Sequence, residues 1–256
     1  MTQTLLGVDG VSVRFGGIAA LDGVSFAIEE GQLAALIGPN GAGKSTLFDC
    51  ICRMRDCDSG SIAFDGRELL GLPPRAIAAA GIGRSFQNPA LFGSMSVLQN
   101  VMVGCHCRGR DGFLAHALRL PRAVSRERET EARARALLLR LGLQSVAERP
   151  VAELSLALQK RAELARVLAT EPKLLLLDEP ASGLARDEVS ELGALLQQQR
   201  DQQGTTVLLV EHNLELVMRI STTVIVLDFG RKIADGPPQE VRHHPEVVQA
   251  YLGGGR

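Results

Sequence analysis

The sequence predicts an α/β fold in which a mostly parallel sheet is accompanied by a small antiparallel sheet and an inserted helical segment. Short apolar runs rich in Val, Ile and Leu alternate with helical stretches, a pattern typical of parallel strands covered on both faces. Segments nearer the start instead alternate apolar with small or polar residues, as half-exposed antiparallel strands do. Between about residues 88 and 150 no strand pattern occurs, and we interpret this stretch as helical.

These patterns predict one domain with an insertion. The 256 residues are enough for one large core. Residues 1–87 and 151–256 are expected to form that core, including the antiparallel sheet, and residues 88–150 a helical lobe.

Each expected element has its own local signal. The parallel strands are predicted in the buried-looking runs 33–37, 174–177, 207–210 and 224–227, and the antiparallel strands at 11–13, 24–28 and 62–64. Asp65-Gly66 predicts a tight turn after the last of these. In the lobe, Ser125 is expected to cap a helix at its start and Gly142 to end it.

Composition and charge exclude several classes of protein. Hydrophobic residues make up 45% and charged residues 22% of the chain, as in globular proteins, and the net charge of -1 provides no basic surface for nucleic acid. The apolar runs are too short to cross a bilayer, and the first residues lack the pattern of a signal peptide. We therefore expect a cytoplasmic protein that reaches a membrane only through a partner.

The cysteines indicate reduced, structural thiols. An odd number in a cytoplasmic chain argues against a disulfide framework; the five are Cys50, Cys52, Cys57, Cys105 and Cys107. The alternative is a metal site at Cys105-His106-Cys107, but structural zinc usually requires a second ligand pair at a set distance.

The most specific signal is a phosphate-binding loop between a predicted strand and a predicted helix. The motif G-x-x-x-x-G-K-[ST] is matched by Gly38, Pro39, Asn40, Gly41, Ala42, Gly43, Lys44, Ser45 and Thr46. Glycines let backbone N–H groups surround phosphate oxygens, and the helix start adds partial positive charge. Lys44 is expected to bridge the β- and γ-phosphates and Ser45 to bind Mg²⁺. The alternative, a glycine-rich turn without a ligand, does not account for the whole motif, so the sequence predicts binding of a nucleoside triphosphate.

Two carboxylates and a histidine follow later strands. Asp178 and Glu179 end a run of four leucines, where parallel strands present side chains to the same crevice as the phosphate loop. Asp178 is expected to hold Mg²⁺ through water, and Glu179 to act as general base toward the attacking water. His212, after the next strand, is expected to contact the γ-phosphate, and Gln87 to reach both Mg²⁺ and that water. The alternatives are that Asp178 and Glu179 are ordinary acids at a solvated strand end, and that His212 has only a structural role.

Together these residues resemble the ATP-binding subunits of ABC transporters, over essentially the whole chain. The phosphate loop, Gln87, the Leu154-Ser155 segment, Asp178-Glu179 and His212 occur in that family's order and rough spacing. Several further stretches are similar to importers of branched-chain amino acids, namely 86–88, 104–121, 211–217, 226–231 and 250–253. The resemblance implies a P-loop NTPase core of the ABC type, with ATP and Mg²⁺ as cofactors and Phe15 stacked on adenine.

The same resemblance implies partners. Two ATPase subunits would pair head to tail around two ATP molecules, each site using one chain's phosphate loop and the other chain's signature loop. Two membrane permease subunits, and indirectly a solute-binding protein, complete such importers. The segment Pro89-Ala90-Leu91-Phe92 is a candidate docking patch for a permease. The alternative is that Leu91 and Phe92 fill the core of the lobe.

The signature loop departs from the family pattern. Ser155 is retained and is expected to cap the following helix while touching the partner's γ-phosphate, but Ala157 replaces a glycine that permits close approach. Ala185 stands where relatives carry Asp or Asn, and Arg53 and Cys57 where they carry Gly and Pro. The chain's own ATP side therefore looks complete, whereas its contribution to the partner's site looks weakened. This favours a heterodimer as the working form.

Four functions are consistent with these features. The first is an ATPase subunit that drives uptake of branched-chain or similar hydrophobic amino acids. The second changes the cargo to urea, amides or a lipid. The third is an ABC-type protein acting on nucleic acid, which usually has tandem ATPase units or long coiled-coil inserts that this chain lacks. The fourth is a poorly hydrolysing regulatory subunit, suggested by the altered signature loop.

Overall fold

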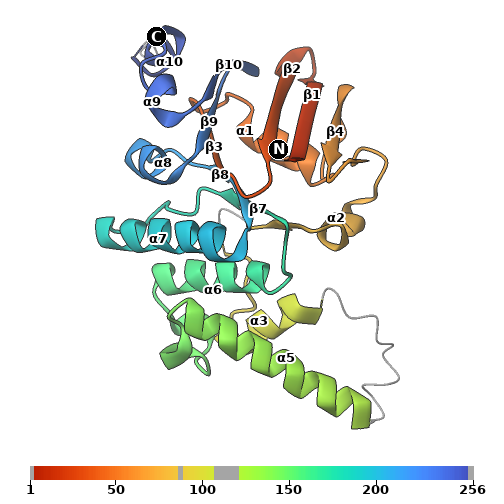
Figure 1. The fold of residues 1–256 in the computed structure, drawn as a ribbon, viewed down its shortest axis with the longest axis vertical. Helices are drawn as coiled ribbons and strands as arrows, with labels where there is room; N and C mark the ends of the chain where they lie inside the picture. The colour runs from red at the N-terminus through yellow and green to blue at the C-terminus, as the bar shows by residue number, and fades with distance from the viewer. Residues whose placement is uncertain (1–2, 86–88, 107–120, 253–256) are drawn as a thin grey trace. The chain divides into compact units, whose positions relative to one another are not determined.

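The computed structural model describes residues 3–85, 89–106 and 121–252, and it divides the chain into two compact units (Figure 1). The first comprises residues 1–87 and 173–256, and the second residues 88–172. The second unit thus continues beyond Pro150, the lobe end expected from sequence, because α6 (Leu156–Leu168) packs against the lobe helices α3 (Val97–His106) and α5 (Pro121–Arg140).

A six-stranded sheet forms the centre of the first unit, in the order β10-β9-β3-β8-β7-β6. All neighbouring pairs are parallel except β10 with β9. The bounds are β3 Leu33–Ile37, β6 Ile82–Arg84, β7 Leu174–Asp178, β8 Thr206–Val210, β9 Thr223–Asp228 and β10 Arg231–Gly236. The four predicted parallel strands are confirmed, and the two edge strands β6 and β10 are additions.

A second, antiparallel sheet has the order β2-β1-β4-β5. Its strands are β1 Thr4–Phe15, β2 Ile18–Glu29, β4 Ser59–Phe64 and β5 Arg67–Glu68. The predicted strands here are confirmed, and β1 and β2 are longer than expected. Asp65 and Gly66 form the turn between β4 and β5 with positive φ angles of 50° and 72°, as expected for a tight hairpin.

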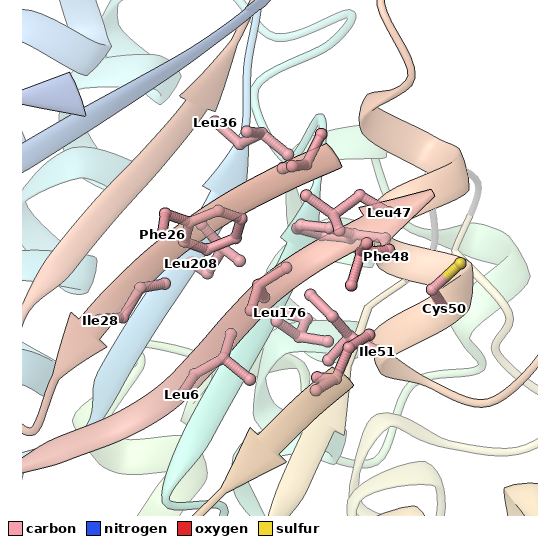
Figure 2. Close-up of a cluster of buried hydrophobic side chains, with 14 of the residues drawn as sticks. Leu6, Phe26, Ile28, Leu36, Leu47, Phe48, Cys50, Ile51, Leu176 and Leu208 are labelled. Carbon is pink, nitrogen blue, oxygen red and sulfur yellow. The ribbon is translucent and has the colours of Figure 1, made fainter. Parts of the chain in front are cut away.

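The core of the first unit lies between the two sheets and encloses helix α1 (Lys44–Ile51). Figure 2 shows Phe26 of β2, Phe48 of α1 and Leu176 of β7 converging on one cluster. The strands β3, β7, β8 and β9 are buried on both faces, which explains their continuous apolar runs. The remaining helices of this unit are α2 Pro74–Ala80, α7 Arg186–Gln203, α8 Leu214–Ile220, α9 Pro238–Val241 and α10 Pro245–Leu252.

Among the described residues of the second unit, the regular structure is helical apart from an isolated bridge between Ser96 and Pro150. Helix α5 begins at Pro121, so the expected start at Ser125 is wrong. Proline suits the first turn of a helix, where its missing N–H leaves no acceptor unpaired. Gly142 does follow the helix end, with φ 68° and its N–H donating to Leu139 O. Two short 3₁₀ turns, Gln144–Val146 and Val151–Glu153, connect α5 to α6.

In the part of the chain that the structure describes, no helix combines the length and apolar character needed to span a membrane.

Candidate nucleotide site

The phosphate loop connects β3 to α1 and is shaped by close backbone contacts. A Cβ atom at Gly38 would collide with the carbonyl oxygen of Leu227, and one at Gly43 with the carbonyl oxygen of Ala20. Both glycines also have positive φ angles, 149° and 101°, which other residues rarely adopt. Gly41 has φ 82° and open space around it. The loop therefore requires glycine for two different reasons, close packing and backbone conformation.

A hydrogen-bonded turn from the neighbouring strands supports the loop. Gly230, in the turn between β9 and β10, donates its N–H to Ala42 O at 3.1 Å, and its own carbonyl accepts from Asp22 N at 2.8 Å. Within the loop, Ala42 N donates to Pro39 O at 3.2 Å. Of the predicted site residues, Asn40, Gly41 and Ser45 are exposed, whereas Pro39 and Thr46 are half-buried.

Lys44 is buried at the start of α1, with only 5% of its surface exposed. Its Nζ donates to Gly38 O at 2.8 Å and to Pro39 O at 2.9 Å. Burial lowers the pKa of its ammonium group, and the negative charges of Glu179 and Asp178 oppose that change. The structure thus places the lysine of the loop near both predicted carboxylates.

Asp178 ends β7, and Glu179 follows it with a positive φ angle of 47°. That backbone conformation is held by a hydrogen bond from Glu179 N to Val210 O at 2.9 Å. Burial raises the pKa of the Asp178 carboxyl, and Arg84, whose Nη2 lies 3.5 Å from Asp178 Oδ2, opposes the rise. Residues 178 and 179 therefore sit at the carboxyl end of the sheet, where β7 and β8 are neighbours.

His212 and Glu179 are brought together across the ends of β8 and β7. The His212 Nε2 atom lies 2.9 Å from Glu179 Oε1. The Glu179 side chain is 21% exposed and the His212 side chain 43% exposed, so both remain open to a bound molecule. A partly exposed carboxylate hydrogen-bonded to a histidine is suited to position water and accept a proton.

Glu211 is a supporting residue that the sequence analysis did not identify. Its side chain is buried, with 3% of the residue exposed. Glu211 Oε1 accepts from Ala181 N at 2.6 Å, and Oε2 accepts from His212 N at 3.1 Å and Asn213 N at 3.2 Å. This carboxylate connects the segment after Glu179 to the segment that carries His212. The sequence signal that could have identified Glu211 is its position, as an acidic residue directly after an apolar strand.

Phe15 lies at the end of β1 and is 40% exposed. The guanidinium carbon of Arg55 lies 4.3 Å from the centre of its ring, which is a cation–π contact. Arg53 adopts a positive φ of 59°, and its side chain contacts Leu72 O and Asp56. The loop after α1 therefore holds a non-glycine residue in the left-handed backbone conformation.

The signature-loop residues belong to the second unit. Ser155 caps α6, as predicted, with its Oγ accepting from Leu158 N at 3.4 Å. Ala157 lies in the first turn of this helix and is half-buried. Gln87, predicted to reach Mg²⁺ and water, lies outside the described residues.

The residues fit a nucleotide with Mg²⁺. The glycines at 38 and 43 let the loop pack directly against the backbone of Leu227 and Ala20, and a buried ammonium lies beside the loop. The hydroxyl of Ser45 and the carboxylate of Asp178 are oxygen donors, which Mg²⁺ prefers. Among the described residues no group of three or more His, Cys, Asp or Glu side chains is arranged to hold a metal by itself. Cys107, part of the alternative metal motif, lies outside those residues.

Comparison with known proteins agrees with this geometry. The family model described as ABC transporter matches residues 21–182, and one described as Branched-chain amino acid ATP-binding cassette transporter matches residues 231–256. The chain is 41% identical over 253 residues to the high-affinity branched-chain amino acid transport ATP-binding protein BraF of Pseudomonas aeruginosa, covering 99% of both chains. It is 39% identical to LivG of Escherichia coli over the same share of each chain.

A solved structure shares the fold. The ADP conformation of MJ1267, an ATP-binding cassette of an ABC transporter, is 31% identical, with a TM-score of 0.86, over 98% of this chain and 100% of that one. Members of this family hydrolyse ATP to power transport. The phosphate loop, the strand-end carboxylates and the full-length similarity together establish that the chain belongs to the ATP-binding subunits of ABC transporters.

Proposed function

We propose that this chain binds ATP with Mg²⁺ at the phosphate loop and hydrolyses it with Glu179 as general base, to energise uptake of branched-chain or similar hydrophobic amino acids. The observation that carries the proposal is the 2.9 Å contact between Glu179 and His212 in the unit that holds the loop. A general base must lie within reach of the proton it takes, and a partner must orient it.

Each residue has a separate task in this proposal. Lys44, which the structure places beside the loop carbonyls, contacts the β- and γ-phosphates, while loop N–H groups donate to phosphate oxygens. Ser45, Gln87 and Asp178 hold Mg²⁺, which neutralises charge on the phosphates. His212 orients Glu179 and donates toward the γ-phosphate, and Phe15 stacks on adenine.

The first test is Glu179→Gln, which keeps the shape of the side chain but cannot accept a proton. We expect kcat to fall by about 10²–10⁴-fold because general-base catalysis is lost. The dissociation constant for ATP should stay within about threefold, since Glu179 is not a phosphate ligand. Single-turnover hydrolysis and nucleotide titration measure the two effects separately. Hydrolysis at the wild-type rate in this variant would refute the role of Glu179.

The cargo proposal is supported by the names of the relatives and by the match of residues 231–256 to the branched-chain model. The test is uptake of labelled leucine by vesicles that contain this chain with its permeases. Competition by unlabelled valine and isoleucine should reduce uptake, whereas urea should not. Transport of urea without leucine transport would favour the second cargo class.

The partners follow from the family and from one exposed patch. We propose a second ATPase subunit and two membrane permeases, with a solute-binding protein outside, so that this chain works at the inner membrane face. Phe92 is 52% exposed, and its backbone is fixed by Asn100, whose Oδ1 accepts from Phe92 N at 2.9 Å. An exposed aromatic residue on a fixed loop supports docking over core filling. The test is co-purification of Phe92→Ser with the permeases.

A second candidate function, a regulatory subunit that hydrolyses poorly, is favoured by Ala157 in the signature loop. In a heterodimer, Ala157→Gly should raise turnover at the site built on the partner's phosphate loop. We expect an increase of about threefold or more, because removing a methyl from a tight contact is worth on the order of 1 kcal/mol. Unchanged ATPase activity of the reconstituted complex would remove the support for unequal sites.

A further inference from the structure

One guanidinium joins three elements of the nucleotide-binding unit. Arg84, the last residue of β6, directs Nη1 to Asp49 Oδ1 on α1 at 2.8 Å and Nη2 to Asp178 Oδ2 at the end of β7 at 3.5 Å. The side chains of Arg84 and Asp178 are each 13% exposed, and that of Asp49 is 33% exposed. The sequence analysis assigned no role to Arg84 or Asp49.

The fork of the guanidinium suits this position. Arginine presents several N–H donors in one plane and stays charged, so it can serve two carboxylates at once in a way that lysine cannot. The guanidinium carbon also lies over the Phe48 ring, 6.0 Å from its centre. Because Asp49 and Asp178 carry like charges, the cation between them also reduces their repulsion.

The same strand fixes the backbone of Asp178. Arg84 is paired with Leu176 in the parallel β6–β7 register, and Ser85 N donates to Leu176 O at 2.9 Å. Ser85, the residue that follows β6, engages Asp178 directly, because its Oγ atom accepts from Asp178 N at 3.4 Å. The end of β6 therefore restrains Asp178 at its side chain through Arg84, and the residue after the strand, Ser85, restrains its main chain.

We propose that Arg84 is a positioning residue that orients the Asp178 carboxylate for the Mg²⁺ that accompanies the nucleotide. By engaging one oxygen of Asp178, Arg84 limits rotation of the carboxylate and so fixes the direction of the other. The contact to Asp49 links the same guanidinium to helix α1 and is separate from the contact to Asp178. This inference rests on the proposed role of Asp178 in the magnesium site, and it goes beyond that role by naming the group that sets the geometry of the carboxylate.

The test measures the magnesium gain, defined as the dissociation constant of a fluorescent ATP analogue in EDTA divided by that in saturating Mg²⁺. The full chain is compared with Arg84→Met, Asp49→Ala and the double variant, and thermal unfolding without nucleotide checks that each is folded. We expect Arg84→Met to reduce the gain by about 10- to 100-fold, as loss of a group that orients a metal-binding carboxylate does. The dissociation constant in EDTA should change little.

Asp49→Ala is the matched control, because it breaks the link to α1 but keeps the contact between Arg84 and Asp178. Its magnesium gain should stay within about threefold of wild type. In the double variant the repulsion between residues 49 and 178 is removed, so the variant should fold even if Arg84→Met alone does not. We expect it to show the same reduced gain as Arg84→Met.

Three results would overturn the inference: a wild-type gain in Arg84→Met, an equal loss in Asp49→Ala, or recovery of the gain in the double variant. An equal loss in Asp49→Ala would mean that Arg84 serves to anchor α1. Recovery of the gain in the double variant would mean that Arg84 only balances charge. A wild-type protein without any magnesium gain would instead refute the proposed metal role of Asp178, so the two failures are distinguishable.

Discussion

Glu211→Ala is the substitution that best tests how the structure supports its catalytic pair. The Glu211 carboxylate accepts hydrogen bonds from the backbone N–H groups of Ala181, His212 and Asn213, and it is buried. Alanine at this position removes all three acceptor contacts. The segment that follows Glu179 and the segment that carries His212 then lose their shared anchor.

The cost can be worked from these contacts. Ala181 is buried, so its N–H loses its acceptor where water does not replace it readily, at about 1–3 kcal/mol. His212 and Asn213 are exposed, so their N–H groups reach water and lose on the order of 0.5–1 kcal/mol each. The total is about 3 kcal/mol, which corresponds to a fall in Tm of about 6–12 °C for a protein of this size.

The effect on activity should be larger than the effect on binding. A displacement of about 1 Å in a catalytic group reduces kcat by about 100-fold. Affinity for ATP should change little, because the phosphate loop is held by other contacts. Thermal unfolding of the nucleotide-free chain, nucleotide titration and single-turnover hydrolysis provide the three measurements.

The control is Glu215→Ala, which removes an exposed carboxylate from α8 and should change stability by no more than about 0.5 kcal/mol. Glu211→Gln keeps one oxygen acceptor, so its stability should lie between those of Glu211→Ala and Glu215→Ala. The reasoning is refuted if Glu211→Ala unfolds at the same temperature as Glu215→Ala. It is also refuted if ATP affinity falls by the same factor as kcat, since that would indicate general collapse of the site.

Two further predictions concern stability. Gly38→Ala should lower the free energy of unfolding by about 3 kcal/mol or more, because the added Cβ meets backbone and φ is positive. The control Gly204→Ala, at a position with φ 65° and open space, should lower it by about 1 kcal/mol. Equal urea midpoints for the two variants would contradict the packing argument. Lys173 donates to Asp65 at 2.6 Å, and this hydrogen bond lowers the pKa of Asp65 from its ordinary 3.8. The pair therefore stabilises the fold above that value and ceases to do so as the pH falls through the lowered pKa. The stability difference between wild type and Lys173→Met should accordingly shrink on acidification, and a difference that grows toward low pH would show the opposite sign of coupling.

Sequence alone predicts the parts of this protein whose signals are local. The phosphate loop is contiguous, so its glycines and Lys44 could be identified from spacing alone. The buried strands 174–177 and 207–210 are also visible, because a strand covered on both faces must be apolar throughout. The turn at Asp65-Gly66 is another local signal, since few residue pairs adopt two positive φ angles.

The missed features depend on contacts distant in sequence. Arg84 and Glu211 are ordinary charged residues until the fold places Asp49, Asp178 and backbone N–H groups around them. The edge strand β10 is polar, because each of its residues is exposed or half-buried, and its residues give no apolar run. The start of α5 at Pro121 was missed because the capping signal at Ser125 lies inside the helix.

The contact of the phosphate loop with the β9–β10 turn has a consequence for how affinity evolves. Gly38 abuts Leu227, and Ala42 is hydrogen-bonded to Gly230, so contacts with this hairpin support the shape of the loop. Ordering a free backbone would cost about 1–2 kcal/mol per residue, and a loop already in shape avoids that loss at the moment of binding. Substitutions in this distant hairpin can thus tune ATP retention while the nine motif residues stay unchanged.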